Sequence, residues 1–203
     1  MTWVKICGIT DEAARDAAIE GGADAVGFVL AAGSPRSISI ERATALMRGV
    51  PILRFIVTVD LTPSQALHAA QVTAADGIQN HGRHATAVAA AAIDAGYSSL
   101  HPVRVTAQGP DIDVGSIPGA SLPLFDTASA FVHGGTGVAF DWHVLESPGR
   151  PFVLAGGLGV DNVAEAIRVL CPFGVDASSR LETEPGSKDP GTIAAFVREA
   201  KGT

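Results

Sequence analysis

The stretch Trp3-Val4-Lys5-Ile6-Cys7-Gly8-Ile9-Thr10 decides the fold of this chain, because it predicts a strand that ends abruptly and leads into a helix. The β-rich run stops at Gly8, and a polar cap follows that can start a helix running to Gly21. Side chains alternate along a strand, so Lys5 and Cys7 share one face if the residues between them pack against helices. We therefore expect a lysine and a thiol to point inward from this strand.

The same unit recurs along the chain. Strand-like apolar runs are each followed by a turn and, in most cases, by a helix-periodic segment. The expected strands are 4–7, 25–30, 53–59, 77–79, 99–103, 122–125, 152–155 and 174–177, and the expected helices are 11–20, 40–47, 63–74, 85–95, 162–170 and 190–200. The fifth and sixth units are weaker, because glycine and proline interrupt residues 108–119, and their helices are expected to be short or missing.

Strands that alternate with helices predict a parallel sheet, and eight units are enough to close it into a barrel. The prediction is an α/β fold, a single-domain (β/α)8 TIM barrel over residues 1–203 with phosphate-binding loops at its C-terminal end. The alternative is an open doubly wound sheet. That fold would be expected to carry a Gly-x-Gly-x-x-Gly turn after its first strand, and Cys7-Gly8-Ile9-Thr10 is not one.

Composition limits the possible functions. Hydrophobic residues make up 47% of the chain and charged residues 17%, which favours a well-packed globular protein over a disordered one. The net charge of -7 argues against a nucleic-acid partner, and no apolar run is long enough to span a membrane. The N-terminus also lacks a secretory pattern. We expect a cytoplasmic protein, a monomer or homodimer, with reduced cysteines.

In a barrel of this kind the active site lies at the carboxyl ends of the strands. Polar residues stand at these positions along the chain, and taken one by one each is most simply a capping or loop residue, just as Cys7 alone is most simply an inert buried thiol. Together they predict a site. The candidates at the strand ends are Cys7, Arg36, His81, Asp126, Asp176, Ser178 and Ser179.

A phosphate group is the anion that these strand ends best accommodate. Gly156-Gly157 follows the seventh strand, where glycine lets backbone N–H groups approach an anion, and Ser178-Ser179 follows the eighth. A phosphorylated small molecule is therefore the expected ligand, in spite of the net negative charge. The glycine-rich run 132–137 is too long for an ordinary connection and is expected to close over a substrate, although a plain surface loop is the simpler alternative.

The sequence resembles the phosphoribosylanthranilate isomerase family of tryptophan biosynthesis. The resemblance runs nearly end to end. It rests on Lys5 to Thr10, Ser34-Pro35-Arg36, His81-Gly82, Phe125-Asp126-Thr127, Gly134-Gly135-Thr136-Gly137 with Phe140-Asp141-Trp142, Ala155-Gly156-Gly157-Leu158 with Asn162-Val163, and Gly174-Val175-Asp176 through Pro185-Gly186-Ser187-Lys188-Asp189.

The resemblance implies an Amadori rearrangement of N-(5-phosphoribosyl)anthranilate by general acid/base catalysis, without a cofactor or a metal. It assigns Asp126 as the general acid and Cys7 as the general base, and it places Arg36 near the anthranilate. His81 and Asp176 are then expected to bind substrate, and Gly156, Gly157, Ser178 and Ser179 to bind its phosphate.

These roles make demands on two pKa values. Desolvation should raise the pKa of Asp126 from about 3.9, so that it holds a proton near neutral pH. The pKa of Cys7 should fall from about 8.5, and the neighbouring Lys5 is the expected source of positive charge. Two residues depart from the family pattern: Asn80 stands where leucine is usual and Arg180 where glycine is common, and both are expected near the pocket.

Two other classes of function stay open. One is a Schiff-base lyase of the aldolase type that uses the inward-pointing Lys5 as its nucleophile. The other is a binding protein that holds a phosphorylated ligand without converting it. A metal site is not expected, because the six histidines show no recognisable ligand spacing with Cys, Asp or Glu.

Overall fold

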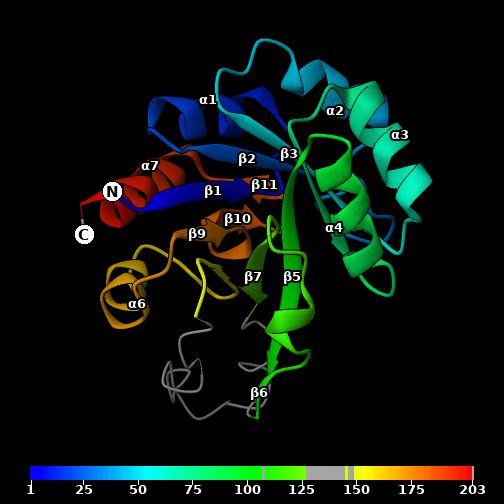
Figure 1. Cartoon of the computed structure of the whole chain (residues 1–203). Coiled ribbons are helices and arrows are strands. Elements are labelled where there is room, and N and C mark those ends of the chain that lie inside the picture. Colours follow the sequence, from blue (N-terminus) through cyan, green and yellow to red (C-terminus); the bar gives the residue numbers. More distant parts are fainter. Residues whose placement is uncertain (107, 127–144, 146–148, 203) are drawn as a thin grey trace.

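A closed parallel barrel forms the centre of the computed structural model, which describes residues 1–106, 108–126, 145 and 149–202 (Figure 1). Its strands pair in the order β4-β3-β2-β1-β9-β8-β7-β5, and pairing of β4 with β5 closes the ring. The strands are β1 (Trp3–Cys7), β2 (Ala25–Val29), β3 (Leu53–Val59), β4 (Gly77–His81), β5 (Ser98–Thr106), β7 (Leu122–Asp126), β8 (Val153–Ala155) and β9 (Gly174–Ala177). The (β/α)8 barrel expected from the sequence is confirmed.

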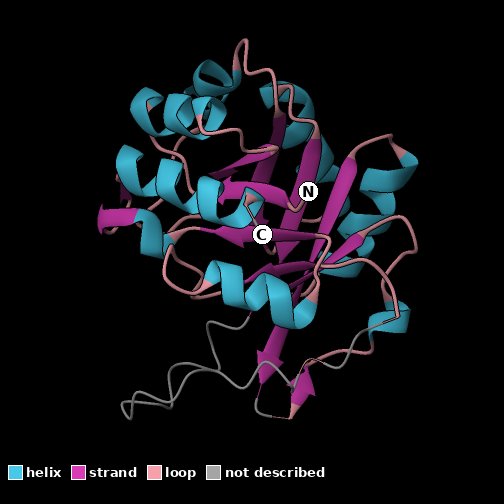
Figure 2. Cartoon of the chain, turned by 90° about the vertical axis from the view of Figure 1, so that its left-hand side faces the viewer, coloured by secondary structure: helices cyan, strands magenta, loops and turns pink. Residues whose placement is uncertain are grey.

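Helices surround the barrel, and both termini lie at the same end of it (Figures 1 and 2). The described helices are α1 (Glu12–Glu20), α2 (Ile40–Met47), α3 (Pro63–Thr73), α4 (Ala85–Asp94), α6 (Val163–Leu170) and α7 (Pro190–Lys201). Several begin at a side chain that satisfies a free backbone N–H of the first turn. Asp11 accepts from Ala14 at 2.8 Å, and Thr62 starts α3 with a reciprocal capping box to Gln65.

The connections after β5 differ from regular helices, as the glycines and prolines of this region predict. β5 continues to Thr106 and pairs antiparallel with the short strand β6 (Gly109–Pro110), and a single 3-10 turn, η1 (Val114–Ser116), follows. The segment that would hold the sixth helix lies outside the described residues. A small hairpin was not predicted from the sequence. It consists of β10 (Glu182–Glu184) and β11 (Ser187–Lys188) and follows the 3-10 helix η3 (Ser179–Leu181).

Alternation along β1 sorts its side chains between two environments. Val4 and Ile6 point outward into the main apolar core between the barrel and the helices, and both are fully buried. Part of the barrel interior is filled by a separate apolar group that includes Phe55, Leu100 and Leu124. Lys5 points into the barrel interior, where it donates to Gln79 and Asp176, so the strand faces expected from the sequence are confirmed.

No helix among the described residues combines the length and the apolar character that crossing a membrane requires.

Candidate active site

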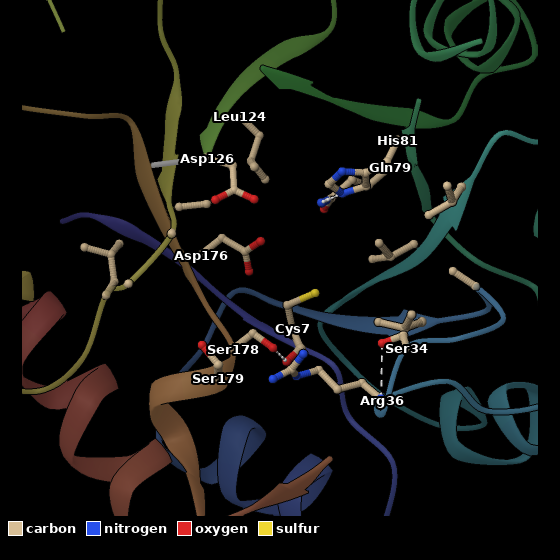
Figure 3. Close-up of a pocket in the computed structure, with 18 residues that line it drawn as sticks. Cys7, Ser34, Arg36, Gln79, His81, Leu124, Asp126, Asp176, Ser178 and Ser179 are labelled. Carbon is tan, nitrogen blue, oxygen red and sulfur yellow. Dashed lines mark hydrogen bonds between the residues drawn. The ribbon is translucent and has the colours of Figure 1, made fainter. Parts of the chain in front are cut away.

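A cavity of about 360 Å³ opens at the carboxyl ends of the barrel strands (Figure 3). Its volume lies within the range of small-molecule sites. The residues of its wall include every candidate named from the sequence: Cys7, Arg36, His81, Asp126, Gly156, Gly157, Asp176, Ser178 and Ser179. The fold therefore brings together side chains that are up to 172 positions apart in the chain, the interval between Cys7 and Ser179.

Lys5 is buried directly below this cavity, with none of its surface exposed. Its ammonium group donates to Asp176 Oδ2 at 2.8 Å and to Gln79 Oε1 at 3.0 Å. Burial lowers the pKa of Lys5, but the negative charges of Asp176 and Cys7 outweigh this effect and raise it. A protonated amine cannot attack a carbonyl, and Lys5 does not line the cavity, so the geometry disfavours the Schiff-base alternative.

The neighbouring strand β2 leaves space for the side chains of Lys5 and Cys7 because it has a glycine, Gly27, opposite Cys7. A Cβ atom added at Gly27 would lie 3.1 Å from both Cys7 Sγ and Lys5 Cε, closer than most real Cβ contacts. Any larger residue here would push against the two functional side chains of β1.

The structure contradicts the expected ionisation of Cys7. Burial raises the pKa of the thiol, and the positive charges of Lys5 and Lys188 oppose this shift without overcoming it. The carboxylate of Asp176 adds to the rise. The sequence-based expectation was wrong because it counted the charge of Lys5 but could not see that Cys7 is only 8% exposed and that the carboxylate of Asp176 also acts on it.

This pKa can be measured through alkylation, since the thiolate is the reactive form of cysteine. In a Cys171→Ser variant, which keeps only Cys7, the rate of reaction with iodoacetamide should still be rising at pH values where free cysteine has levelled off. The exposed Cys171, studied alone in a Cys7→Ser variant, is the reference thiol. A midpoint for Cys7 below that of free cysteine would contradict the structure.

Two carboxylates face the cavity from opposite sides of β8. Asp126 ends β7 and Asp176 lies in β9, and Figure 3 shows both directed into the same space as the sulfur of Cys7. Asp176 uses Oδ2 to accept from Lys5, whereas its buried Oδ1 has no hydrogen-bond partner within the described part of the chain. A buried acceptor of this kind is available to a hydroxyl group of a ligand.

Arg36 is held by a carboxylate that sequence reasoning did not identify. Its Nε and Nη2 donate to Glu182 at 2.6 and 2.8 Å, and Lys188 donates to the same carboxylate. Burial acts to raise the pKa of Glu182, but the hydrogen bonds from both cations outweigh it and lower the pKa. One carboxylate shared by two cations leaves one net positive charge on this side of the cavity. The Pro185-Gly186 turn was the available signal, because it predicts a hairpin that folds Lys188 back on Glu182.

The glycine and serine pairs lie on neighbouring loops at the cavity wall. Gly156 and Gly157 have φ values of 87° and 67°, a region that side chains rarely adopt. Asn162 fixes the first loop, because it donates to the carbonyl of Gly157 at 3.0 Å and accepts from Gly159 at 2.8 Å. On the second loop, Ser178 Oγ donates to the carbonyl of Cys7 at 3.0 Å.

The two residues that depart from the family pattern lie outside the cavity wall. Asn80 was expected near the pocket, but it points away from the barrel interior, where it accepts from Thr58 at 2.7 Å and donates to the carbonyl of Leu61 at 3.3 Å. That expectation was wrong, and strand alternation explains why, since Gln79 and His81 occupy the inner face. Arg180 donates to the carbonyl of Gly157 at 3.1 Å and to Asp161 at 2.9 Å, so it braces the glycine loop from outside.

The glycine-rich run 132–137, expected to close over a substrate, lies outside the described residues. Within the described ranges, no three His, Cys, Asp or Glu side chains are grouped closely enough to hold a metal ion.

Comparisons with known proteins give a consistent result. Residues 4–199 match the model of the family described as N-(5'-phosphoribosyl)anthranilate (PRA) isomerase. A protein of that name from Rubrobacter xylanophilus is 37% identical over 205 residues, which cover 99% of this chain and all of the relative. The structure of phosphoribosyl anthranilate isomerase from Thermotoga maritima is similar with a TM-score of 0.85 and 34% identity, with each chain covered completely.

A further solved structure is relevant to the cavity. It is a phosphoribosyl anthranilate isomerase in complex with reduced 1-(o-carboxyphenylamino)-1-deoxyribulose 5-phosphate, and it is similar to this chain with a TM-score of 0.82, 33% identity and complete coverage of both. Since the family model spans almost the whole sequence and full-length relatives exceed 30% identity, this chain belongs to the N-(5'-phosphoribosyl)anthranilate isomerase family.

Proposed function

We propose that this chain catalyses the Amadori rearrangement of N-(5'-phosphoribosyl)anthranilate to 1-(2-carboxyphenylamino)-1-deoxyribulose 5-phosphate, a step of tryptophan biosynthesis. The observation that carries the proposal is a single cavity that has a thiol, a carboxyl group, a guanidinium group and a glycine loop around its wall. A binding protein would need the glycine loop and a cation. It would have no need for a thiol and a carboxyl group facing the same ligand.

The substrate's two anionic groups define its direction in the cavity. The phosphate would bind between Gly156-Gly157 and Ser178-Ser179, where backbone N–H groups and the hydroxyl of Ser179 can donate to it. The anthranilate carboxylate would face Arg36, whose guanidinium keeps N–H donors beyond the two that Glu182 uses. The ribose then lies between them, above Asp176, whose free Oδ1 can accept from a sugar hydroxyl.

The reaction is a series of proton transfers that one acid and one base can perform. Asp126 would donate a proton to the ribose ring oxygen, which breaks the bond from that oxygen to C1 and leaves a protonated Schiff base between C1 and the anthranilate nitrogen. Cys7, as the thiolate, would remove the proton from C2, and the electron pair of that bond moves toward the nitrogen to give an enolamine. The Cys7 thiol would then return a proton to C1 while the Asp126 carboxylate takes the proton of the C2 hydroxyl, which forms the C2 carbonyl and restores both groups.

The raised pKa of Cys7 gives this mechanism a testable pH dependence. The thiol must lose its proton before it can act as a base, so kcat/KM of the free enzyme should rise with pH through the pKa of Cys7. Positive groups near Cys7, mainly Lys5, limit how far burial moves that pKa. The proximity of the bound reactants to both groups supplies the rest of the acceleration.

The proposal is tested by following the loss of fluorescence of N-(5'-phosphoribosyl)anthranilate generated in situ. Turnover by the wild-type chain, with competitive inhibition by inorganic phosphate, is the expected result. A chain that binds phosphate at this cavity but converts none of the substrate would overturn the proposed reaction and favour the binding-protein alternative.

A further inference from the structure

A chain of three polar side chains runs from the floor of the cavity to its wall. Lys5 Nζ donates to Gln79 Oε1 at 3.0 Å, and Gln79 Nε2 lies 2.9 Å from His81 Nε2. Gln79 is 3% exposed, and strand alternation places it with His81 on the inner face of β4. The proton transfers proposed for Asp126 and Cys7 involve neither the amide of Gln79 nor the proton on the His81 ring.

The chemistry of Lys5 fixes the orientation of the Gln79 amide. An ammonium group carries donors and no acceptor, so the atom of Gln79 that faces it must be the carbonyl oxygen. The amide nitrogen must then face His81. Because an NH2 group only donates, His81 Nε2 must be the acceptor and can carry no proton.

The reverse arrangement would place two donors against each other at one end of the amide. With a proton on Nε2, His81 would face the NH2 group of Gln79 directly, and rotating the amide would turn that NH2 group toward the ammonium of Lys5. Either arrangement loses a hydrogen bond in a buried site. The buried lysine thus determines the proton position on a ring that it does not touch.

The groups around His81 also act on its charge. Burial lowers the pKa of His81, and the positive charge of Lys5 on β1 and the ring of His101 on β5 lower it further. Asp126 on β7 acts in the opposite direction without reversing the result. The neutral ring is therefore favoured, and a neutral ring with a bare Nε2 carries its proton on Nδ1.

We propose that Gln79 is a positioning residue that holds His81 as the neutral Nδ1–H tautomer, so that His81 offers one hydrogen-bond donor to an acceptor oxygen of the substrate. Within the described part of the chain, Gln79 is the one hydrogen-bond partner of the His81 ring, which leaves Nδ1 for a ligand. The role toward substrate rests on the proposed isomerase function. The tautomer does not, since it follows from contacts within the protein.

The test is nitrogen NMR of the imidazole rings in the unliganded protein near neutral pH, compared with two variants. Gln79→Glu keeps the shape of the side chain but replaces its donor with an acceptor, whereas Gln71→Glu makes the same chemical change on the exposed face of α3. In wild type and in Gln71→Glu, His81 should show a protonated Nδ1 and an unprotonated Nε2. In Gln79→Glu, Nε2 should become protonated, and the pKa of His81 should rise by about 1 to 3 units.

A wild-type spectrum with the proton on Nε2, or an imidazolium ring near neutral pH, would overturn the inference. The same follows if Gln79→Glu leaves the His81 signals unchanged. Circular dichroism shows whether the variant is folded, and Gln79→Met, which removes the donor without adding a charge, gives a second variant. In Gln79→Met the Nδ1–H preference should weaken, with no rise in pKa comparable to that of Gln79→Glu.

The pH profile of turnover separates a positioning role from a structural one. If His81 donates through Nδ1, the activity of Gln79→Glu relative to wild type should fall as pH rises through the raised pKa, because the imidazolium still carries Nδ1–H whereas the neutral ring keeps its proton on Nε2 and leaves Nδ1 bare. A purely structural defect would lower activity equally at all pH values. Should the wild-type chain show the expected tautomer yet convert no substrate, the proposed function fails and the assignment of the His81 proton stands.

Discussion

Replacing Asp126 with asparagine is expected to lower kcat by about 10²- to 10⁴-fold, the usual contribution of a positioned general acid. Asparagine has nearly the same shape and keeps a donor, but its amide does not release a proton to the ribose ring oxygen. Binding should change little, because the phosphate and carboxylate of the substrate contact other residues. Steady-state kinetics with N-(5'-phosphoribosyl)anthranilate measures both quantities, and inhibition by inorganic phosphate reports binding separately.

Cys7→Ser should produce a loss of similar size, since a hydroxyl group is a far weaker acid than a thiol and supplies almost no anion to take the C2 proton. Groups that act in one reaction are not additive, so the double variant should be about as slow as the slower single variant. Asp94→Asn, at an exposed position at the end of α4, is the matched control and should keep full activity. If Asp126→Asn retains more than roughly a tenth of wild-type kcat, Asp126 is not the general acid.

Lys5→Met is expected to reduce the free energy of unfolding by about 3 to 5 kcal/mol at neutral pH. Methionine fills much of the space of the lysine stem, so the loss arises mainly from charge. Asp176 would remain as a buried carboxylate without the ammonium that lies 2.8 Å away in the wild type. Urea unfolding with an unchanged m-value measures the difference, which is large relative to the total stability of a typical domain.

The double variant Lys5→Met/Asp176→Leu tests the origin of that loss. Removing both charges should restore most of the stability, because well-packed apolar replacements of a buried ion pair are often neutral or better. Activity should not return with it, since Asp176 and the Lys5 contact to Gln79 are both gone. A double variant as unstable as Lys5→Met would show that packing, and not the unpaired carboxylate, caused the effect.

The pH dependence of Lys5→Met follows from the same reasoning. In the wild type, burial already raises the pKa of Asp176, and Lys5 opposes that rise without overcoming it. Without Lys5, the folded-state pKa of Asp176 should therefore lie still further above its unfolded value of about 3.9. A group whose pKa is raised by folding loses stability as pH increases from the unfolded to the folded pKa. The difference in the free energy of unfolding between Lys5→Met and wild type should therefore be small below about pH 4 and reach its full size above the raised pKa of Asp176.

The fold could be predicted well from the sequence because glycines and helix caps mark where its strands end. Gly8 and the capped helix after it end β1 sharply, and helix α2 was predicted with the bounds that it has in the structure, Ile40–Met47. The extension of β5 through Thr106 was missed, because Pro102 and Gly109 read as breaks in the pattern. They instead lie within or beside a strand that leaves the barrel and pairs with β6.

The site was predicted less completely than the fold, for a physical reason. Strand ends can be located from local pattern, so the set of cavity residues was found, whereas partners from distant loops could not be assigned. Glu182 is 146 positions from Arg36, and no periodicity connects them. The pKa of Cys7 was predicted in the wrong direction because it depends on burial, which only the three-dimensional structure gives.

The bond between Lys5 and Asp176 joins residues 171 positions apart, on the first and last strands of the barrel. Contacts of such large sequence separation form late, since a long loop must be closed before they contribute. On the ribosome, which extends the chain from its N-terminus, β1 therefore emerges with its lysine unpaired and waits for β9. Gln79 on β4 can reach Lys5 earlier, but Asp176 joins only when β9 closes the barrel, so a chain that has not completed its barrel has no complete site.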